Sequence, residues 1–337
     1  MSTYLERVDL PFYRQYVEPF LPERVLDFHT HVYRADQFGA RSGPSRSWAE
    51  YVSPRSWPVE TLLRFYERVL PGKRVTPVVF GMPLNDPDFD AANRFTADSA
   101  ARVGGYAFLL TNPVWSAAQL AQRVRSGGFR GLKPYPTTVR GKSEAEISIF
   151  DYLPHDHLAV AEDLGLCVLL HLPRPGRLAD PANVAEVHEI CARHPCLKLV
   201  IAHVGRAYCL PTAERGLAAL RDCPSLHYDI SANANADVFE LALREVGPQR
   251  LIFGTDLPAV AFRARRVCEG DNYVNLVRQA GYTDSHLRVA PPQERDSITF
   301  YVYEQFAAFR RAAERVGLSC TDVEDVFWHN AMRLLDA

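Results

Sequence analysis

The chain has 337 residues, of which 47% are hydrophobic and 23% are charged, and its 38 basic residues nearly balance its 40 acidic residues. This length suits one large α/β barrel or two ordinary domains. The net charge of −2 gives no reason to expect nucleic acid or an anionic membrane as a partner. We therefore expect a small-molecule substrate and leave a homo-oligomer open.

Targeting signals and cysteine usage bear on the compartment. No apolar stretch approaches the roughly 18 residues of a membrane span, and the first residues lack the apolar core of a signal peptide. The chain has 7 cysteines, an odd number, and none of them form a CxxC pair. Most of them are expected to be small core residues in a reducing compartment, so we predict no zinc finger or disulfide scaffold and a cytoplasmic protein.

Short apolar runs alternate with longer helical patterns after residue 24. Residues 1–23 are expected to form a leading helix or extension. The apolar runs predict eight strands, at residues 24–33, 74–81, 104–112, 129–135, 166–172, 197–204, 226–232 and 250–257. They are apolar on both faces, as parallel strands covered by helices must be. Three of the stretches between them carry helix-start signals, at Ser116, Asp180 and Asp237.

Eight β-then-α units in a row predict one α/β domain over residues 1–337, a parallel eight-stranded (β/α)₈ or TIM barrel. Helices over residues 297–337 are expected to close it and cover its outside. Three segments break the rhythm, at residues 34–58, 137–154 and 259–296. Each follows a strand, so we expect all three on the catalytic face, where long loops form lids.

The first predicted strand carries two histidines, His29 and His31, in the run VLDFHTHVY. Residues two apart in a strand point to the same face, so both rings aim at one point. Neutral imidazoles in that position can share a cation, and zinc accepts such nitrogens at about 2.0–2.1 Å. The alternative is a pair of core histidines bonded to backbone carbonyls.

Other ionisable residues end predicted strands in the same way. They are Lys133 in GLKPYP, His171 in VLLHLP, His203 in VIAHVG and Asp256 in IFGTDLP. Chemistry in such a barrel takes place at the carboxyl ends of the strands. A closed barrel would therefore bring these distant residues to one rim, beside the two histidines of the first strand.

This combination of residues resembles the amidohydrolase superfamily. The fragments DFHTH, GLKPYP, IAHVG, FGTDLP and FWHNAMRLL are similar to its amidohydrolase-related branch, over residues 24 to 336. That branch includes metal-dependent hydrolases and lactonases, and non-oxidative decarboxylases of small carboxylic acids. The resemblance is specific for the fold and the metal site and poor for the substrate.

The resemblance implies a ligand set of three imidazoles and one carboxylate, with a position left for water. One zinc or manganese ion per chain would be held by His29, His31, His171 and Asp256. The metal would lower the pKa of that water from about 15.7 toward ~7, with Asp256 also accepting a proton. The alternatives are a helix cap for Asp256 and a bonded core histidine for His171.

Two residues have alternative roles that depend on the number of metals. With one metal, His203 is a general acid or base or polarises a carbonyl, and Lys133 binds a substrate carboxylate or oxyanion. With two metals, His203 is a ligand and Lys133 is carboxylated to a bridging carbamate. The branch that this chain resembles favours one metal.

Residues just past the strand ends are candidates for binding the substrate. Arg174 and Arg206 could grip a carboxylate with two bonds, although loop arginines are commonly only solvated, and Tyr135 is a weaker candidate. The reaction expected from the family is hydrolysis of a lactone, ester or amide in a small carboxylate-bearing substrate. The alternatives are decarboxylation of a small aromatic or unsaturated acid, and a barrel without catalytic function.

Overall fold

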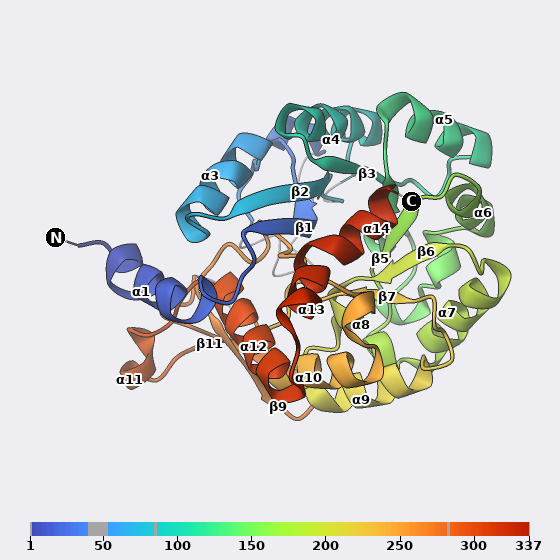
Figure 1. Cartoon of the computed structure of the whole chain (residues 1–337). Helices are drawn as coiled ribbons and strands as arrows, with labels where there is room; N and C mark the ends of the chain where they lie inside the picture. The colour runs from blue at the N-terminus through green and yellow to red at the C-terminus, as the bar shows by residue number, and fades with distance from the viewer. Residues whose placement is uncertain (1, 40–52, 84–85, 282–283, 337) are drawn as a thin grey trace.

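Eight parallel strands form the centre of the computed structural model, which describes residues 2–39, 53–83, 86–281 and 284–336 (Figure 1). They are β1 (Arg24–His31), β2 (Arg74–Phe80), β3 (Tyr106–Leu110), β4 (Gly131–Lys133), β5 (Cys167–Leu170), β6 (Lys198–Ile201), β7 (His227–Asp229) and β8 (Leu251–Ile252). The strands hydrogen-bond in chain order from β1 to β8. The amide of Phe28 donates to the carbonyl of Phe253 at 3.0 Å, which brings β8 back against β1. The predicted barrel is confirmed, and every observed strand lies inside its predicted range.

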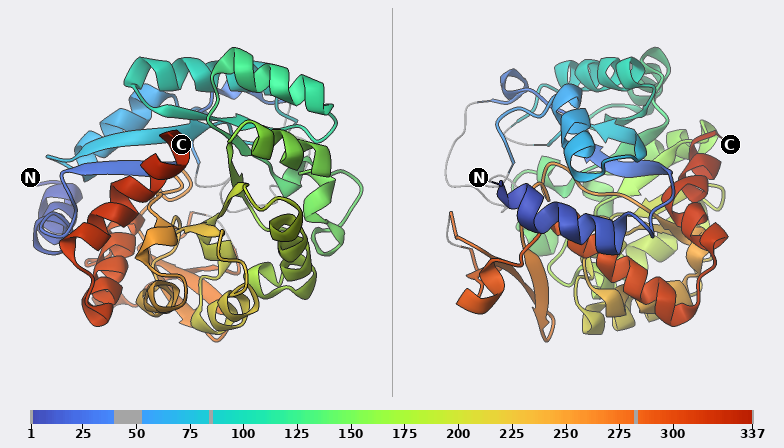
Figure 2. Two further views of the ribbon diagram at one scale, coloured as in Figure 1. Left: turned by 45° about the vertical axis from the view of Figure 1, so that its right-hand side comes forward. Right: turned by 60° about the vertical axis from the view of Figure 1, so that its left-hand side comes forward.

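Helices surround the barrel and cover the outer faces of its strands (Figures 1 and 2). Those between strands are α3 (Val59–Val69), α4 (Phe89–Val103), α5 (Ala117–Gly127), α6 (His155–Asp163), α7 (Pro181–Arg193), α8 (His203–Arg206), α9 (Leu210–Ala219) and α10 (Ala236–Glu245). Ser116 and Asp180 cap α5 and α7 as predicted. The cap of α10 is Asn235, whose side chain accepts from two amides, so the prediction of Asp237 was two residues late.

The barrel has one apolar core inside it and another outside it. The inner core includes Leu26, Phe28, Val78, Phe80, Phe108, Leu169, Val200 and Ile252. Leu334 and Leu335 of α14 (Asn330–Asp336) pack against that inner core. The last helix therefore closes the end of the barrel opposite the catalytic rim, because the interior must be filled by side chains.

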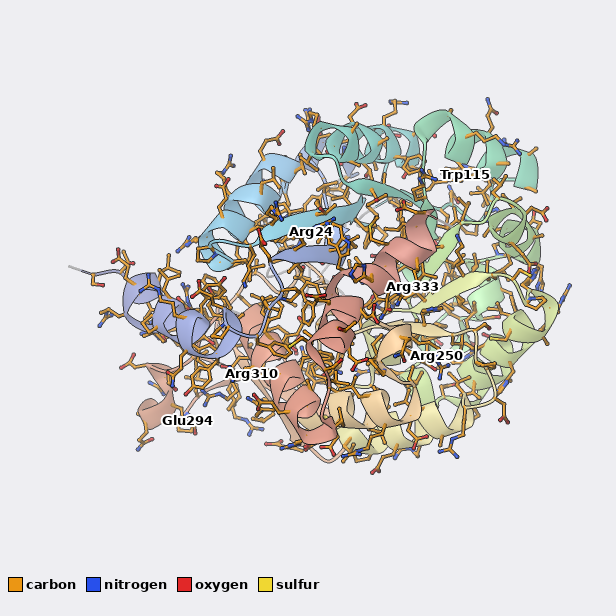
Figure 3. The ribbon with its side chains drawn as sticks, viewed as in Figure 1. Arg24, Trp115, Arg250, Glu294, Arg310 and Arg333 are labelled. Carbon is orange, nitrogen blue, oxygen red and sulfur yellow. A yellow bond between two sulfur atoms is a disulfide. The ribbon has the colours of Figure 1, made fainter. Side chains whose placement is uncertain are left out.

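The two ends of the chain pack together on the outside of the barrel. Residues 5–17 are helical and include α1 (Leu10–Phe12). They lie along α12 (Tyr301–Val316), where the Arg310 guanidinium donates to the carbonyl of Tyr16 at 3.2 Å (Figures 2 and 3). Between α12 and α14 lies α13 (Cys320–Glu324). In the part of the chain that the structure describes, no helix has the length and apolar composition needed to cross a bilayer.

The segment at residues 259–296 contains a second sheet, which the sequence analysis did not predict. Its strands are β9 (Arg265–Glu269), β10 (Asn272–Val277) and β11 (Leu287–Val289), with α11 (Pro292–Arg295) after them. We call these three strands together the lid sheet. Of the other two segments, residues 40–52 lie outside the described residues, and 137–154 contains only short helical turns.

A disulfide joins Cys268 of the lid sheet to Cys209, which follows β6. The other cysteines are free, and Cys167 and Cys223 are buried. The expectation that most cysteines are core residues is wrong, because Cys191 is half-buried and Cys196, Cys268 and Cys320 are exposed, and the disulfide corrects the expectation of reduced thiols for Cys209 and Cys268. Their pairing depends on the lid sheet folding over the loop after β6.

Candidate active site and metal centre

A bulge in β1 turns the two histidines toward the barrel mouth. The register of β1 on β2 shifts between Asp27 and Thr30, and a bulge of this kind changes where side chains aim. Phe28 then packs inside the barrel, while the rings of His29 and His31 lie against Phe80. The backbone of β8 passes close by, because a Cβ on Gly254 would lie 2.8 Å from the Cβ of His29.

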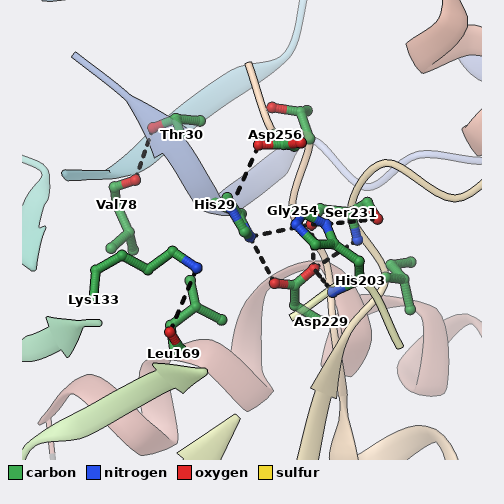
Figure 4. Close-up of polar contacts among 12 residues, drawn as sticks. His29, Thr30, Val78, Lys133, Leu169, His203, Asp229, Ser231, Gly254 and Asp256 are labelled. Atoms are coloured by element: carbon green, nitrogen blue, oxygen red, sulfur yellow. Dashed lines mark hydrogen bonds and ion pairs between the residues drawn. The ribbon is translucent and has the colours of Figure 1, made fainter. Parts of the chain in front are cut away.

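Each of these imidazoles is held by its Nδ1 atom, and Figure 4 shows the contact between His29 and Asp229. The Nδ1 of His29 lies 2.7 Å from a carboxylate oxygen of Asp229, and the Nδ1 of His31 lies 3.1 Å from the carbonyl of Gly81. Carboxylate and carbonyl oxygens only accept, so each Nδ1 carries the ring proton and donates it. Both Nε2 atoms keep their lone pairs, which is the state that binds metals.

Asp256 faces both of these lone pairs. Its Oδ1 lies 3.3 Å from the Nε2 of His31 and 3.5 Å from the Nε2 of His29. The residue has φ = 71°, a left-handed conformation that a non-glycine residue adopts at some energetic cost and that is common at functional sites. Three acceptor atoms therefore converge with no proton between them. A cation fits this arrangement, because it satisfies all three at once.

Titration of these groups also favours a cation. Burial lowers the pKa of His29 well below its ordinary value, and the positive charges of Lys133 and His203 lower it further. Burial raises the pKa of Asp256, but positive charge on the neighbouring histidines lowers it by more. The two effects conflict, since the burial of His29 disfavours the protonation that would stabilise the carboxylate. We favour neutral imidazoles, because a metal ion can supply the positive charge instead.

His171 lies close to this group, at the end of β5. Its ring centroid is 5.3 Å from that of His203 and 5.9 Å from that of Tyr135. Its Nδ1 is buried and has no hydrogen-bond partner among the described residues. Burial lowers the pKa of His171 well below its ordinary value, and the charge of Arg206 lowers it further. An unpartnered neutral nitrogen of this kind suits metal binding, and its place as a ligand stays a prediction.

His203 is held in the same way as the strand-one histidines. Its Nδ1 lies 2.8 Å from the hydroxyl of Ser231, and its ring centroid lies 4.6 Å from that of His29. A second group of potential ligand atoms unites His203, His29 and Asp229. The His29–Asp229 pair is already hydrogen-bonded through Nδ1, so this group is better explained as a hydrogen-bond network than as a second metal site.

Asp229 is the functional residue that sequence reasoning missed. It ends β7 in the run LHYDIS, fully buried, and it accepts from His29 and from the amide of His203 at 3.2 Å. The signal was an ionisable residue in an apolar strand, the same signal that identified the other rim residues. Asp27, the other buried carboxylate near the two histidines, accepts from the hydroxyls of Tyr66 and Thr255 and ties β1 to the loop after β8.

Lys133 and Tyr135 line the other side of the centre. Lys133 is fully buried, with its Nζ 3.4 Å from the carbonyl of Leu169 and 4.7 Å from the ring centroid of Tyr135 (Figure 4). Burial lowers the pKa of Lys133 to about 8, although the charges of Asp229 and Asp256 oppose this. The Tyr135 hydroxyl lies 3.4 Å from the Nε2 of His31.

The two arginines predicted to bind substrate have different surroundings. The Arg174 guanidinium makes two bonds to Glu186, at 3.0 and 2.7 Å, and a third to Asn183. These partners fill the fork that would otherwise hold a substrate carboxylate. The Arg206 guanidinium forms an ion pair with the exposed Glu144, at 3.3 Å, and its positive charge lowers the pKa of His171. The structure therefore brings Arg206 into the site and places Arg174 in a structural ion pair.

The sequence pattern of the family described as amidohydrolase matches residues 26–337. No curated protein sequence matches the chain significantly.

Solved structures resemble the chain at low sequence identity. One is an amidohydrolase from Burkholderia multivorans with bound zinc (TM-score 0.59, 16% identity, 93% of this chain and 99% of that chain). Another is a probable 2-pyrone-4,6-dicarboxylic acid hydrolase from Acinetobacter baumannii (TM-score 0.54, 15% identity, 93% and 99%). A third is a 2,6-dihydroxybenzoate decarboxylase from Rhizobium (TM-score 0.51, 17% identity, 94% and 99%). At such identities they show a shared fold.

Proposed function

The chain belongs to the amidohydrolase family, and from this we propose that it is a metal-dependent hydrolase acting on a lactone, ester or amide bond of a small carboxylate-bearing substrate. One observation carries the proposal. The lone pairs of His29 and His31 and the carboxylate of Asp256 meet within 3.5 Å at the mouth of the barrel. In a purely structural histidine pair, these Nε2 lone pairs would be expected to face hydrogen-bond donors and not a carboxylate.

The proposed ligands of one divalent metal, zinc or manganese, are these three residues and His171, whose buried Nδ1 has no partner among the described residues. When bound, such a metal supplies an acidified water and an electrophile for a carbonyl oxygen. Neutral imidazoles and a carboxylate are the donors that zinc prefers. Asp229 and Gly81 fix the orientation of two of the rings.

The chain's own residues then divide the remaining work. Asp256 lies in the loop after β8 with its Oδ1 facing both imidazoles, where its carboxylate can accept the proton of the attacking water. Lys133, as an ammonium, stabilises the oxyanion that develops on the substrate. His203 has its Nδ1 fixed by Ser231, so the lone pair on its Nε2 can take up a proton during the reaction and then pass it to the leaving group.

A decarboxylase is the second candidate function. It keeps the same residues but requires protonation of a carbon atom as carbon dioxide leaves. Lys133 favours it, because a buried lysine with a pKa of about 8 holds a proton that it can release near neutral pH. A decarboxylase from Rhizobium also shares this fold.

The experiment that tests the proposal combines metal analysis with a two-product assay. Purified protein is expected to carry about one zinc or manganese ion per chain. Lactones, esters and aromatic acids are then supplied while acid release and carbon dioxide release are measured in parallel. Acid release supports the hydrolase and carbon dioxide release the decarboxylase. Full activity in protein stripped of metal would defeat both.

A further inference from the structure

A buried arginine of the lid sheet lies beside the candidate metal centre. Arg266 of β9 is only 8% exposed, and its Nη1 donates to the carbonyl of Ala232 at 2.5 Å. Ala232 directly follows Ser231, whose hydroxyl contacts His203. The lid sheet thus places a fixed positive charge close to the proposed proton donor.

The guanidinium of Arg266 is held in one orientation, but not all of its N–H donors have an acceptor. Its Nε donates to the side chain of Asn275 at 3.0 Å, and with the bond to Ala232 this sets the plane of the group. Its Nη2 is buried and has no hydrogen-bond partner among the described residues. An unsatisfied buried donor costs about 1–3 kcal/mol, and more when the group is charged. This donor is therefore better explained by a ligand than by packing.

A second arginine shares the same aromatic surroundings. The guanidinium of Arg266 lies 4.4 Å from the ring centroids of both Tyr208 and Tyr273, and that of Arg177 lies 5.5 Å from the same two centroids. Arg177 also donates weakly to the carbonyl of Arg206, at 3.4 Å. Within the described ranges neither Arg177 nor Arg266 forms an ion pair with a carboxylate of the chain. The disulfide at Cys268, two residues from Arg266, fixes this part of the lid sheet.

Arg266 is buried and Arg177 is half-buried, and since neither has an ion-pair partner among the described residues, together they form a position where an anion from outside the chain can bind. Burial lowers the pKa of Arg177, and the neighbouring charge of Arg206 lowers it further, but a guanidinium stays charged at neutral pH, so a bound anion would be favourable here. A planar carboxylate matches the planar donors of guanidinium groups. Arg206, Arg177 and Arg266 together would draw an acidic molecule toward the barrel mouth.

We propose that Arg266 and Arg177 bind a carboxylate of the substrate at a distance from the bond that reacts, so that the substrate is a dicarboxylic acid or its lactone or ester. The identity of the reacting end rests on the proposed function. The carboxylate site at the arginine pair is independent of the proposed function, because neither arginine belongs to the candidate metal centre.

Binding of simple diacids tests this directly. Full-length protein loaded with zinc is titrated by calorimetry with malonate, succinate, glutarate and adipate, each compared with the monocarboxylate of equal length. The best diacid should bind at least about tenfold more tightly than its monocarboxylate. Arg266→Gln and Arg177→Gln should each remove most of that preference. Arg266→Lys, which keeps the charge but loses the fork, should retain part of it.

The control is Arg221→Gln, because Arg221 is an exposed arginine paired with Glu245. It should keep the full preference, and thermal melting shows which variants are folded. If Arg266→Gln does not fold, Arg177→Gln decides the question. Equal binding of diacids and monocarboxylates, or an unchanged preference in the folded glutamine variants, would overturn the proposal.

The titrations are repeated on the metal-free chain. A diacid preference that survives without zinc, in a protein with no metal-dependent activity, supports the arginine site and rejects the proposed function. A protein that is active with metal but shows no diacid preference supports the proposed function and rejects the arginine site. The two proposals therefore fail separately.

Discussion

At the scale of single residues, the chemistry of the site depends on which atom of each imidazole is already engaged. His29 and His203 both reach the site with Nδ1 fixed, one by Asp229 and the other by Ser231. The Ser231 hydroxyl also donates to Asp229, which links the two histidines through one carboxylate. This network selects the ring tautomer before any metal arrives, and outer partners of this kind tune metal affinity.

Replacing Asp229 by asparagine tests that role. The variant should fold but bind zinc about 10–100-fold more weakly, because an amide orients His29 less well and makes it less basic. A chelator competition measures the affinity. Asp237→Asn, at an exposed aspartate paired with Arg315, is the matched control and should bind zinc as the wild type does. Equal affinities in both variants would mean that Asp229 has only a packing role.

Two histidine variants distinguish one metal from two. His171→Ala should lower the metal content of the purified protein, since it removes a proposed ligand. His203→Ala should keep one metal per chain and lose about 10²–10⁴-fold in turnover, the range expected for a general acid or base. Metal analysis and steady-state rates measure both. Loss of metal from His203→Ala would favour the two-metal site with carboxylated Lys133.

At the scale of elements, α12 and the lid sheet bring a buried carboxyl group and an arginine together on the barrel. Glu304 in the first turn of α12 is mostly buried, accepts from Thr299 at 3.1 Å and lies 3.8 Å from Arg265 of β9. Burial raises its pKa above the ordinary value of 4.5, although Arg265 and Arg311 oppose this. The folded carboxyl thus holds its proton more tightly than the unfolded one.

This raised pKa predicts how stability depends on pH. Below pH 4.5 the carboxyl is protonated in both the folded and the unfolded state. As the pH rises past 4.5 and then past the raised pKa of the folded state, the unfolded carboxyl ionises more readily than the folded one, so the free energy of unfolding falls. Glu304→Gln should therefore gain stability over the wild type at about pH 8 relative to about pH 4, measured by denaturant unfolding. Glu240→Gln should change in the opposite direction, because Arg244 and Arg315 lower the pKa of that carboxyl. A gain for Glu304→Gln that does not vary with pH would contradict the prediction.

The disulfide between the lid sheet and the loop after β6 predicts the number of free thiols in the protein. Denatured protein without reductant should show five free thiols, and reduced protein seven, because Cys209 and Cys268 are paired. Disulfides persist mainly in oxidising compartments, whereas the sequence led us to propose the cytoplasm. Seven thiols in protein purified without reductant would support that compartment. The Cys209→Ser and Cys268→Ser pair should weaken diacid binding, because Arg266 loses its restraint.

At the scale of the whole molecule, barrel closure is what assembles the site. β1 and β8 are the ends of the sheet in sequence, yet the amide of Asp256 donates to the carbonyl of His29 at 2.8 Å. A barrel that opened at this seam would separate the carboxylate from both imidazoles. Metal binding and barrel stability are therefore coupled.

This coupling predicts that zinc stabilises the fold. At a free zinc concentration about a thousandfold above its Kd, the folded state should gain about 4 kcal/mol, seen as a rise in Tm of several degrees. Differential scanning calorimetry with and without a chelator measures it. Magnesium should give little shift, since it prefers oxygen ligands, and a His29→Ala/His31→Ala variant should not respond to zinc. No rise in the wild type would argue against a site built from β1 and β8.

The sequence by itself determined the eight strands, their order and the rim residues His29, His31, Lys133, His171, His203 and Asp256. Local sequence patterns determine these features, because apolar runs and the ionisable residues within them can be recognised from the sequence alone. Only the tertiary structure decided what each group touches. It paired Arg174 with Glu186, gave His29 its carboxylate partner 200 residues away, and folded the lid sheet so that Cys268 meets Cys209. Such contacts join segments that are distant in the chain, and their geometry exists only once the barrel has closed.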